Sequence, residues 1–359
     1  MNEKISISLC MIVKDEADVI ARCLNSVRDA LDEIIIVDTG SKDNTKSIVE
    51  ELGAKVYDFE WIDDFAKARN FSFSKATKDY IMWLDADDIL LEEDVNKLIN
   101  LKSNFDTTID SVTMNYILGQ DEYGNATSQL RRNRLVKRSN NFQWIGPVHE
   151  YLSVYGNIHS GDINVYHKKL KSSGNRNLRI FEARAAKGEE FSPRDTFYFA
   201  NELYYNNRTD EAITYYEKFI NSKQGWVEDN KTACSNIAEC YAKKKDMDSF
   251  MYYCLKTFQY DIPRADFCCK IAYYFFSSNQ LDQAIFWYDL ATKLPENKGS
   301  LALVQASYST WIPHIQLCVC YSRQGKFVEA NLHNELAAKY IPNNQSVIHN
   351  REYLATQLK

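Results

Sequence analysis

The sequence lacks any apolar run long enough to cross a membrane. A spanning helix needs roughly 18 consecutive apolar residues, and no stretch of the 359 residues reaches that length. The N-terminal segment MNEKISISLCMIV meets charge again at Lys14, which does not fit a secretory signal peptide. We therefore expect a soluble, cytoplasmic protein without a membrane span.

Paired cysteine motifs and an excess of basic charge are absent as well. The nine cysteines include no CxxC pair and no regular framework, so we expect reduced core thiols. The formal net charge is -6 and the pI about 5.7, which argues against a general nucleic-acid-binding protein. The length is about twice that of a typical domain and favours two domains.

Glycine-rich phosphate loops are the third absence, since neither GxGxxG nor GxxxxGK[ST] occurs in the chain. The first half instead alternates buried-strand patterns with helix patterns. The strand patterns are residues 5–13, 32–41, 55–61 and 80–87, and the helix patterns are residues 14–30, 42–54 and 63–77. This alternation predicts an α/β domain of Rossmann-like type with a mostly parallel sheet.

Acidic residues follow the predicted strands. Glu16 comes after the first strand, Asp38 closes the second, and Asp85 and Asp87 close the fourth. Ligands of parallel sheets bind beyond the carboxyl ends of the strands, so we expect these acids to meet at one edge. Each acid alone is equally well explained as a helix cap or a solvated turn. The set together needs a counter-charge, and a divalent cation, Mn²⁺ or Mg²⁺, held by the DAD segment would supply it and carry a phosphate ligand.

Four segments of the first half occur in order: ISLCMIVKDEADVIARCLNSV, IIIVDTGSKDNT, DFAKARN and WLDADD. They resemble the motifs of family 2 glycosyltransferases of the GT-A fold, over roughly residues 5–170. The resemblance implies transfer of a sugar from a nucleotide sugar, most commonly a UDP-sugar, with inversion at the anomeric carbon.

The same resemblance implies a role for each matching residue. Asp38 is expected to contact the base or ribose, and Glu16 to lie beside the nucleotide. Asp85 is expected near the ribose and the metal shell, and Asp87 as a ligand of the metal that bridges the diphosphate. Arg69 is expected to reach the diphosphate, with a solvated helix arginine as the alternative.

Residues 110–170 are expected to hold the acceptor side of the site. The segment QLRRNRLVKR carries five basic residues, namely Arg131, Arg132, Arg134, Lys137 and Arg138. In this family a comparable Arg-rich strand precedes the acceptor site; the alternative is an ordinary basic edge strand.

The segments FQWIGPVHEYL and INVYHKKL resemble parts of family members that are fused to helical repeats. An inverting transfer needs a base that takes the proton of the attacking group. Glu150 is the preferred base, and His149 a neighbour that binds phosphate or orients the substrate. The resemblance makes His167 a third metal ligand. Each histidine is alternatively a structural residue, and Asp88 and Asp121 remain rival bases.

The second half changes character, with fourteen of the 23 tyrosines between residues 195 and 325. Two segments align at an offset of 72, which pairs Ala200 with Ala272 and Tyr216 with Tyr288. A period of about 34 to 37 residues with small residues at helix contacts resembles the tetratricopeptide repeat. We therefore predict three parts: a GT-A domain over 1–170, a linking helix over 171–193 and a tetratricopeptide-like helical repeat domain over 194–359.

The combination resembles the sublancin-type glycosyltransferases that modify bacteriocin precursor peptides (glycocins) on Cys or Ser. We expect a metal-dependent inverting enzyme whose repeats recruit a peptide or protein acceptor or pair two subunits into a homodimer. Transferases that act on cell-surface glycans or lipids share this domain pair and remain the alternative. A repeat scaffold with a degenerate transferase domain is the alternative of another class.

Overall fold

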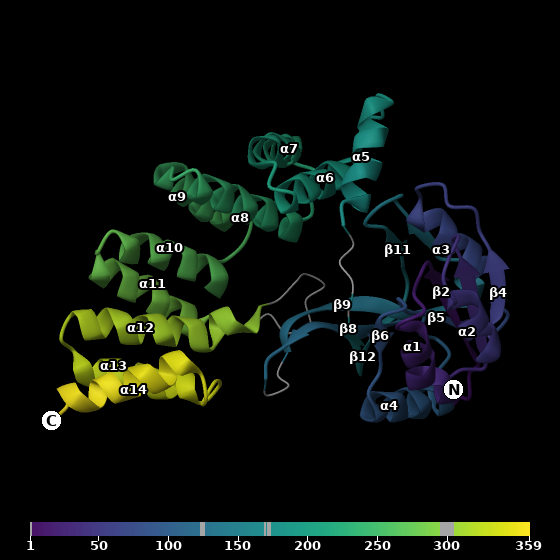
Figure 1. The fold of residues 1–359 in the computed structure, drawn as a ribbon, viewed down its shortest axis with the longest axis horizontal. Coiled ribbons are helices and arrows are strands. Elements are labelled where there is room, and N and C mark those ends of the chain that lie inside the picture. The colour runs from purple at the N-terminus through teal and green to yellow at the C-terminus, as the bar shows by residue number, and fades with distance from the viewer. Residues whose placement is uncertain (1, 123–125, 169, 171–173, 295–304) are drawn as a thin grey trace. The chain divides into compact units, whose positions relative to one another are not determined.

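The computed structural model describes residues 2–122, 126–168, 170, 174–294 and 305–359 (Figure 1). The chain divides into two compact units, one up to Lys187 and one from Gly188 onward. The segment predicted to link them contains helix α5 (Arg176–Ala186), which is part of the first unit.

The first unit is built from alternating strands and helices, as the sequence predicted. Its strands are β1 (Asn2–Glu3), β2 (Ile7–Val13), β3 (Glu33–Asp38), β4 (Lys55–Asp58), β5 (Tyr80–Trp83), β6 (Asp88–Ile89), β7 (Phe105–Asp106), β8 (Ser111–Gln120), β9 (Ala126–Lys137), β10 (Gln143–Ile145), β11 (Tyr151–Ser153) and β12 (Ile158–His167). Its helices are α1 (Ile20–Val27), α2 (Thr45–Glu51), α3 (Phe65–Ser74), α4 (Glu92–Ser103) and α5.

Over the described residues, eight strands form one sheet in the order β4-β3-β2-β5-β9-β8-β12-β6. Strands β4, β3, β2 and β5 run parallel, as the strand–helix alternation predicted. Strand β9 enters antiparallel between β5 and β8, and β8 pairs parallel with β12. The sheet is therefore mixed, with the parallel part at its N-terminal strands.

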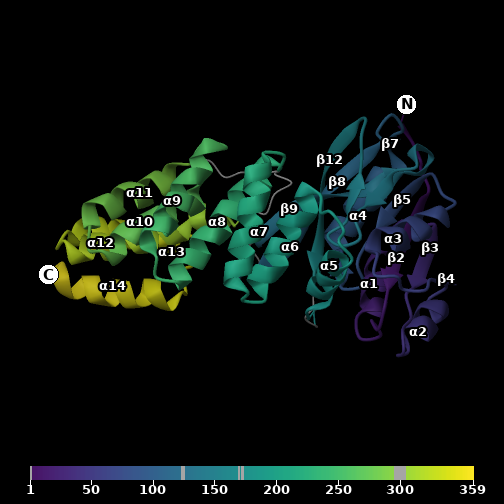
Figure 2. The ribbon, with the colours of Figure 1, turned by 90° about the horizontal axis from the view of Figure 1, so that it is seen from above.

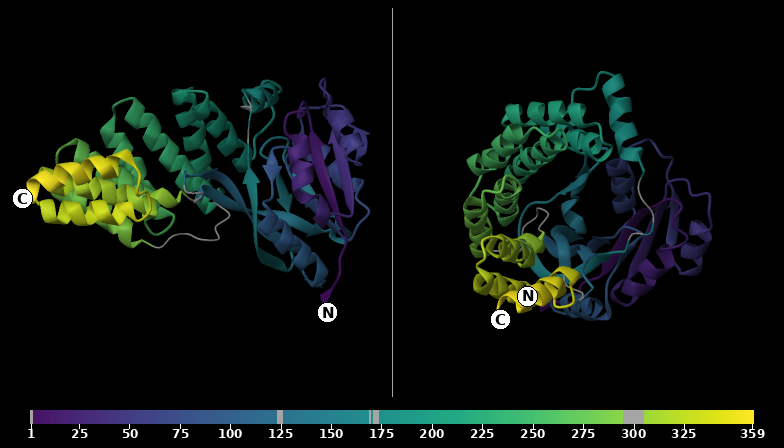
Figure 3. Two further views of the ribbon diagram at one scale, coloured as in Figure 1. Left: turned by 60° about the horizontal axis from the view of Figure 1, so that its bottom comes forward. Right: turned by 60° about the vertical axis from the view of Figure 1, so that its left-hand side comes forward.

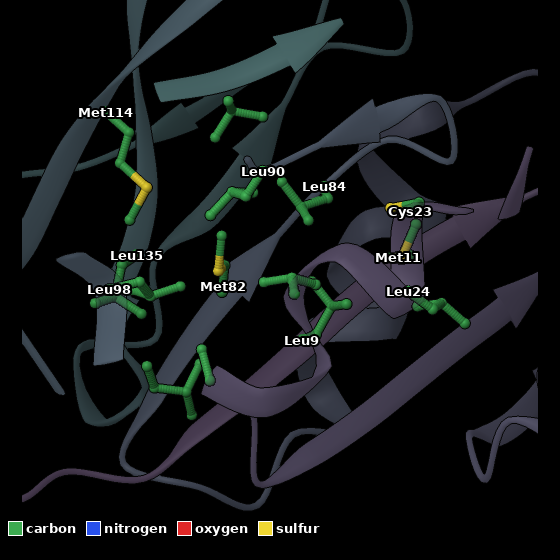
Figure 4. Packing of buried hydrophobic residues seen from close by; sticks show 14 of the residues in the cluster. Leu9, Met11, Cys23, Leu24, Met82, Leu84, Leu90, Leu98, Met114 and Leu135 are labelled. Carbon is green, nitrogen blue, oxygen red and sulfur yellow. The ribbon is translucent and has the colours of Figure 1, made fainter. Parts of the chain in front are cut away.

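Successive residues of the central strands pack into two different cores, because side chains alternate across a sheet. On one face Leu9 and Met82 join a cluster that includes Leu24 of α1 and Leu98 of α4 (Figure 4). On the other face Cys10, Ile81 and Trp83 pack with residues of α3 and of the β10–β11 hairpin. Burial on both faces explains why these strands read as continuous apolar runs.

The arginine-rich segment forms β9, which lies inside the sheet. The expectation of a basic edge strand is therefore wrong, because β5 and β8 flank β9 on both sides. Arg131 braces neighbouring strands: its guanidinium donates to Thr113 Oγ1 at 3.1 Å, to Asn115 Oδ1 at 2.6 Å and to the carbonyl oxygen of Gly161 at 2.7 Å. Arg131 thus has a structural role in this unit.

The second unit is helical throughout its described residues. Its helices are α6 (Pro193–Tyr205), α7 (Thr209–Ser222), α8 (Val227–Lys243), α9 (Met247–Lys256), α10 (Ala265–Ser277), α11 (Leu281–Lys293), α12 (Trp311–Arg323), α13 (Phe327–Ala338) and α14 (Gln345–Gln357). Consecutive helices pack against each other in pairs (Figures 1 and 2), and the pairs follow one another along an arc (Figure 3, right).

Small residues are buried where the helices of this unit pack against one another. Ala200 in α6 and Ala272 in α10 are both fully buried, as are Ala284 in α11 and Ala330 in α13. The aligned Tyr216 and its counterpart in α11 are buried too, which confirms that these tyrosines pack between helices. The array is therefore a tetratricopeptide-like repeat.

The cysteines and the hydropathy of the helices can be compared with the composition. All nine cysteines are buried and unpaired, as predicted for core thiols. Among the described helices, none combines the length and the low polarity that crossing a bilayer requires.

Candidate active site

The candidate site forms where the parallel strands β2, β3 and β5 end. Strands β2 and β3 end in register, with Val13 opposite Asp38. Strand β5 ends at Trp83, and the DADD segment, residues 85–88, begins after Leu84. The acidic residues that follow these adjacent strands therefore lie at the same edge of the sheet.

Asp38, the residue expected to bind the nucleotide, is 2% exposed. Its Oδ1 accepts hydrogen bonds from the backbone amides of Gly40 and Ser41, both at 2.9 Å. Gly40 has a φ of +99°, a conformation that L side chains rarely adopt, so glycine permits this tight turn. Oδ2 of Asp38 is buried and accepts no hydrogen bond within the described part of the chain. A buried oxygen in this state is costly unless a ligand supplies a donor.

Glu16 lies in a loop that is tied to the loop after β3. Its backbone amide donates to Thr45 Oγ1 at 2.8 Å. Next to it, the amide of Asp15 donates to Ser41 Oγ at 2.9 Å, and the carboxylate of Asp15 accepts from the amide of Lys42 at 2.7 Å. These bonds hold the first two acidic loops together at the sheet edge.

The three aspartates after β5 have three different environments. Asp85 Oδ1 accepts from Arg69 Nη2 at 2.7 Å. Asp88 is fully buried, and its Oδ2 lies 3.1 Å from Arg134 Nη2. Asp87 is partly exposed, and its Oδ1 lies 3.3 Å from His167 Nδ1. Burial acts to raise the pKa of Asp85, but the charges of the two arginines outweigh it and hold that pKa at about 2.

Two buried arginines therefore neutralise two of these aspartates. Arg69 is 8% exposed and Arg134 is fully buried. Both guanidiniums lie against Trp83, at 5.1 Å and 3.9 Å from its ring centroid. The sequence argument assigned all of the counter-charge to a bound cation, and this assignment was incomplete. The alternative that Arg69 is a solvated helix arginine is wrong.

Arg69 also reaches the preferred base. Its Nε donates to Glu150 Oε1 at 2.7 Å, so one guanidinium joins Glu150 to Asp85. The next residue, Asn70, bonds both the amide and the carbonyl of Trp144 in β10. Helix α3 thus positions the hairpin that carries Glu150.

His149 has an unusual backbone conformation. Its φ is +52°, which is uncommon for a residue other than glycine. Its ring stacks near that of Phe181 in α5, with centroids 6.5 Å apart. Backbone outliers of this kind gather at functional sites, and this one directly precedes Glu150.

His167 ends strand β12 beside the aspartates. Its Nδ1 lies 3.3 Å from Asp87 Oδ1 and 3.4 Å from Asp88 Oδ1. Hydrogen bonds to these two carboxylates raise the pKa of His167 to about 9, against the opposing effect of burial. Ligand atoms of Asp87, Asp88 and His167 lie within 4.8 Å of one another. Carboxylate and imidazole side chains are donors that divalent metal ions use in proteins.

The structure thus brings together Asp87 and His167, which were predicted as metal ligands, with Asp88 beside them. Asp85 contacts Arg69 instead. Asp88 fits the role of a rival base poorly, because no part of its side chain is exposed. Two features of this region were not predicted from the sequence. One is the presence of Tyr116, and the other is the pairing of Arg134 with Asp88. Spacing carried no signal for either, since both come from strands whose pairing is non-local.

Comparisons with known proteins agree with this architecture. Residues 8–182 match the model of the family "Glycosyl transferase family 2", and residues 265–298 match the model "Tetratricopeptide repeat". Residues 8–182 therefore form a domain similar to family 2 glycosyltransferases, and tetratricopeptide-like repeats follow it.

Two curated relatives are similar to this chain. Over 144 residues it is 39% identical to a TPR repeat-containing protein of Synechococcus elongatus, which covers 40% of this chain and 34% of that protein. Over 234 residues it is 31% identical to the SPbeta prophage-derived glycosyltransferase SunS of Bacillus subtilis, which covers 60% of this chain and 54% of that protein. The aligned part of the chain spans about a third of the first relative's length, 34%, and about half of the second's, 54%.

A solved structure with a similar arrangement is Staphylococcus aureus TarS 1–349 in complex with UDP-GlcNAc. It aligns with a TM-score of 0.41 and 13% identity, and the alignment covers 71% of this chain and 92% of that one.

Proposed function

We propose that this protein is a metal-dependent, inverting glycosyltransferase. It moves a sugar from a nucleotide sugar, a UDP-sugar, to the side chain of a Cys, Ser or Thr in a peptide or protein. One observation carries the proposal: the pair Asp87–His167 lies beside a buried arginine that joins Asp85 to Glu150. Groups for a cation, a diphosphate and a proton transfer therefore adjoin one another at the sheet edge.

The donor set at this edge fits a divalent cation. Asp87 and His167 are partly exposed and face each other, whereas Asp88 behind them is buried and already paired with Arg134. Asp87 and His167 would hold Mn²⁺ or Mg²⁺. When bound there, the cation would act as a Lewis acid that offsets the charge developing on the leaving diphosphate. Arg69 is the nearby cationic side chain of the protein itself.

The nucleotide end of the donor is assigned to Asp38 and Glu16. The Oδ2 atom of Asp38 is a buried acceptor without a donor in the described part of the chain. An N–H of the base or a ribose hydroxyl would satisfy it. Because the loops of Asp38 and Glu16 are tied together by hydrogen bonds, the pocket for the nucleoside is organised before the ligand arrives.

Glu150 is assigned the role of base. In an inverting transfer the acceptor attacks the anomeric carbon from the face opposite the leaving group, and its proton passes to a carboxylate. Arg69 holds Glu150 Oε1 and so fixes the orientation of this carboxylate. His149, next in the chain, is assigned to orienting the acceptor.

The repeat unit is assigned to the acceptor polypeptide or to a second copy of the chain. Its tyrosines differ in exposure: Tyr216 is fully buried, whereas Tyr205 and Tyr273 are 68% and 57% exposed. Exposed aromatic side chains are enriched where proteins bind one another. This supports a binding role for the array in addition to its packing.

The proposal is tested with a panel of nucleotide sugars assayed for nucleotide release, with and without Mn²⁺. Release from one donor only with the metal, together with a mass increase of one hexose-type unit on an acceptor peptide, is expected. Transfer to glycans or lipids alone would move the acceptor to the alternative class. No release, and no Mn²⁺-dependent thermal stabilisation by UDP, would favour the non-catalytic scaffold. Light scattering of the full chain tests the homodimer.

A further inference from the structure

Behind the candidate cation site lies a buried tyrosine that the proposed reaction does not use. Tyr116, in β8, is 8% exposed. Its hydroxyl donates to Asp88 Oδ1 at 2.9 Å and also lies 2.9 Å from His167 Nδ1. One hydroxyl thus links the most buried aspartate of the DADD segment to the histidine at the end of β12.

The hydrogen-bond roles in this group follow from counting donors. Asp88 is paired with Arg134 and also accepts from the backbone amide of Asp85 at 3.0 Å, so its carboxylate acts only as an acceptor. The single hydroxyl hydrogen of Tyr116 therefore goes to Asp88. The oxygen of Tyr116 is then left to accept from His167 Nδ1.

The other neighbours of this ring nitrogen are acceptors as well. Asp87 Oδ1 and Asp88 Oδ1 lie 3.3 and 3.4 Å from His167 Nδ1. With a hydroxyl oxygen and two carboxylates around it, Nδ1 is the nitrogen that keeps a hydrogen. In the neutral form of the ring, Nε2 is then the nitrogen whose lone pair is available.

We propose that Tyr116 is a positioning residue that keeps the hydrogen of His167 on Nδ1 and so leaves Nε2 to bind a divalent cation. The inference rests on the proposed cation site and adds the group that orients its histidine. Metal-binding histidines usually donate their other N–H to a carboxylate or an oxygen, which fixes the ring and the tautomer. Here the oxygen belongs to Tyr116, and Asp88 orients Tyr116 in turn.

Arg134 completes this buried group from the opposite side. Its guanidinium lies 3.9 Å from the ring centroid of Trp83 and 4.4 Å from that of Tyr116, and it pairs with Asp88. Arg134 lies at Oδ2 of Asp88 and leaves Oδ1 to accept from the hydroxyl of Tyr116. Asp88 therefore remains an acceptor, and the direction of the Tyr116 hydrogen bond is set.

The first experiment locates the hydrogen directly. Full-length protein with ¹⁵N-labelled histidine is studied by NMR without cation over a rising pH series, up to the pH at which the ring shifts of His167 stop changing, and at pH 7.5 with Mg²⁺ and UDP. His167→Gln identifies the resonances among the six histidines. A hydrogen on Nδ1 in the cation-free protein is the expected result. A hydrogen on Nε2 there would overturn the inference and leave the proposed function standing.

The second experiment measures cation affinity without any assay of activity. Binding of Mn²⁺ in the presence of UDP is followed by the electron paramagnetic resonance signal of the free ion. Tyr116→Phe is expected to weaken this binding about tenfold or more, the usual effect of removing a group that orients a metal ligand. Affinity within twofold of the unchanged protein would refute the role of Tyr116.

A matched control exists in the same sheet. Tyr80 in β5 is 2% exposed, and its hydroxyl donates to the carbonyl oxygen of Ile109 at 2.7 Å. Tyr80→Phe removes the same atom from an equally buried place and is expected to bind Mn²⁺ normally. An equal loss in both variants would mean a general packing effect and would also refute the inference. If the unchanged protein binds no Mn²⁺, the proposed cation site fails, and the tautomer measurement still decides the hydrogen position.

Discussion

Arg69 Nε lies 2.7 Å from Oε1 of Glu150, although 81 positions separate the two residues in the chain. The same guanidinium contacts Asp85, so it lies between two carboxylates from different loops. Burial acts to lower the pKa of Arg69, but the negative charges of Asp85 and Glu150 outweigh it and raise that pKa. This arginine therefore stabilises the fold and also positions the proposed base.

Removing the charge of Arg69 is expected to destabilise the first unit strongly. In Arg69→Met two carboxylates face each other without a cation, and breaking a buried pair in this way costs about 3–5 kcal/mol. The free energy of unfolding at pH 7, from urea denaturation, measures the loss.

Arg351→Met is the matched control. Like Arg69, Arg351 donates two hydrogen bonds to carboxylates, but both go to one residue, Glu335, and both side chains are nearly half exposed. Solvent screens such a pair, so less than about 1 kcal/mol should be lost. Equal losses in the two variants would contradict the buried role of Arg69.

Glu150→Gln is expected to abolish transfer while sparing donor binding. Gln keeps an Oε1 atom that accepts from Arg69 but has no carboxylate to take the acceptor proton. Loss of a positioned base typically lowers the rate about 10²- to 10⁴-fold. Initial rates and UDP titrations are compared: a parallel loss of rate and UDP affinity would make Glu150 a structural residue.

Asp87→Asn is expected to lower turnover at least about 100-fold, because a group that offsets developing charge on the leaving diphosphate is weakened. Circular dichroism should stay unchanged, since the side chain of Asp87 is partly exposed and Asn keeps its size and shape. Removal of metal by a chelator should produce the same loss. Asp162→Asn is the control. The side chain of Asp162 is 87% exposed, and its only ion pair among the described residues is with Lys97. Near-normal turnover of Asp87→Asn would remove its metal role.

The order of the early elements was predictable because the signals are local. Strands such as β2 and β3 are runs of apolar and β-branched residues, and a parallel layout follows once helices alternate with them. The half of the sheet after β5 was not predictable. There β9 inserts between β5 and β8, a pairing between distant segments that no local pattern encodes.

The candidate site shows the same difference between features that local sequence predicts and features that depend on distant segments. Acids at the ends of parallel strands were predictable, since those ends meet at one edge by geometry. The partners of the acids were not, because Arg69 reaches Glu150 and Arg134 reaches Asp88 only after the hairpin and β9 have docked. The sequence shows only that Arg134 belongs to a basic segment. Its structural role follows from its burial against Trp83 in the folded unit.

Truncation after Lys187, where the first compact unit ends, is expected to weaken acceptor use more than donor hydrolysis. The residues assigned to the donor all lie before that position, whereas the exposed tyrosines of the repeat lie after it. We expect KM for the acceptor peptide to rise about tenfold or more, with UDP-sugar hydrolysis within threefold. Unchanged acceptor kinetics in a truncated chain with normal circular dichroism would remove the recruitment role.

Glu33, at the start of β3, is expected to make stability depend on acid pH. Its carboxylate accepts from Ser8 Oγ at 2.6 Å, Lys55 Nζ at 2.8 Å and the amide of Thr77 at 2.9 Å. Burial acts to raise the pKa of Glu33, but these bonds outweigh it and lower that pKa from 4.5 to about 2.

A carboxylate with a lowered folded-state pKa contributes stability that is present above its unfolded pKa and lost as the pH falls. The unfolding free energy should therefore drop by on the order of 3 kcal/mol from this group between pH 4.5 and pH 2. Glu33→Gln should be less stable at pH 7 and lose less on acidification. Urea midpoints of both proteins at pH 7, 4.5, 3 and 2 measure the difference, and curves that stay parallel over this range would show that Glu33 is not the group responsible.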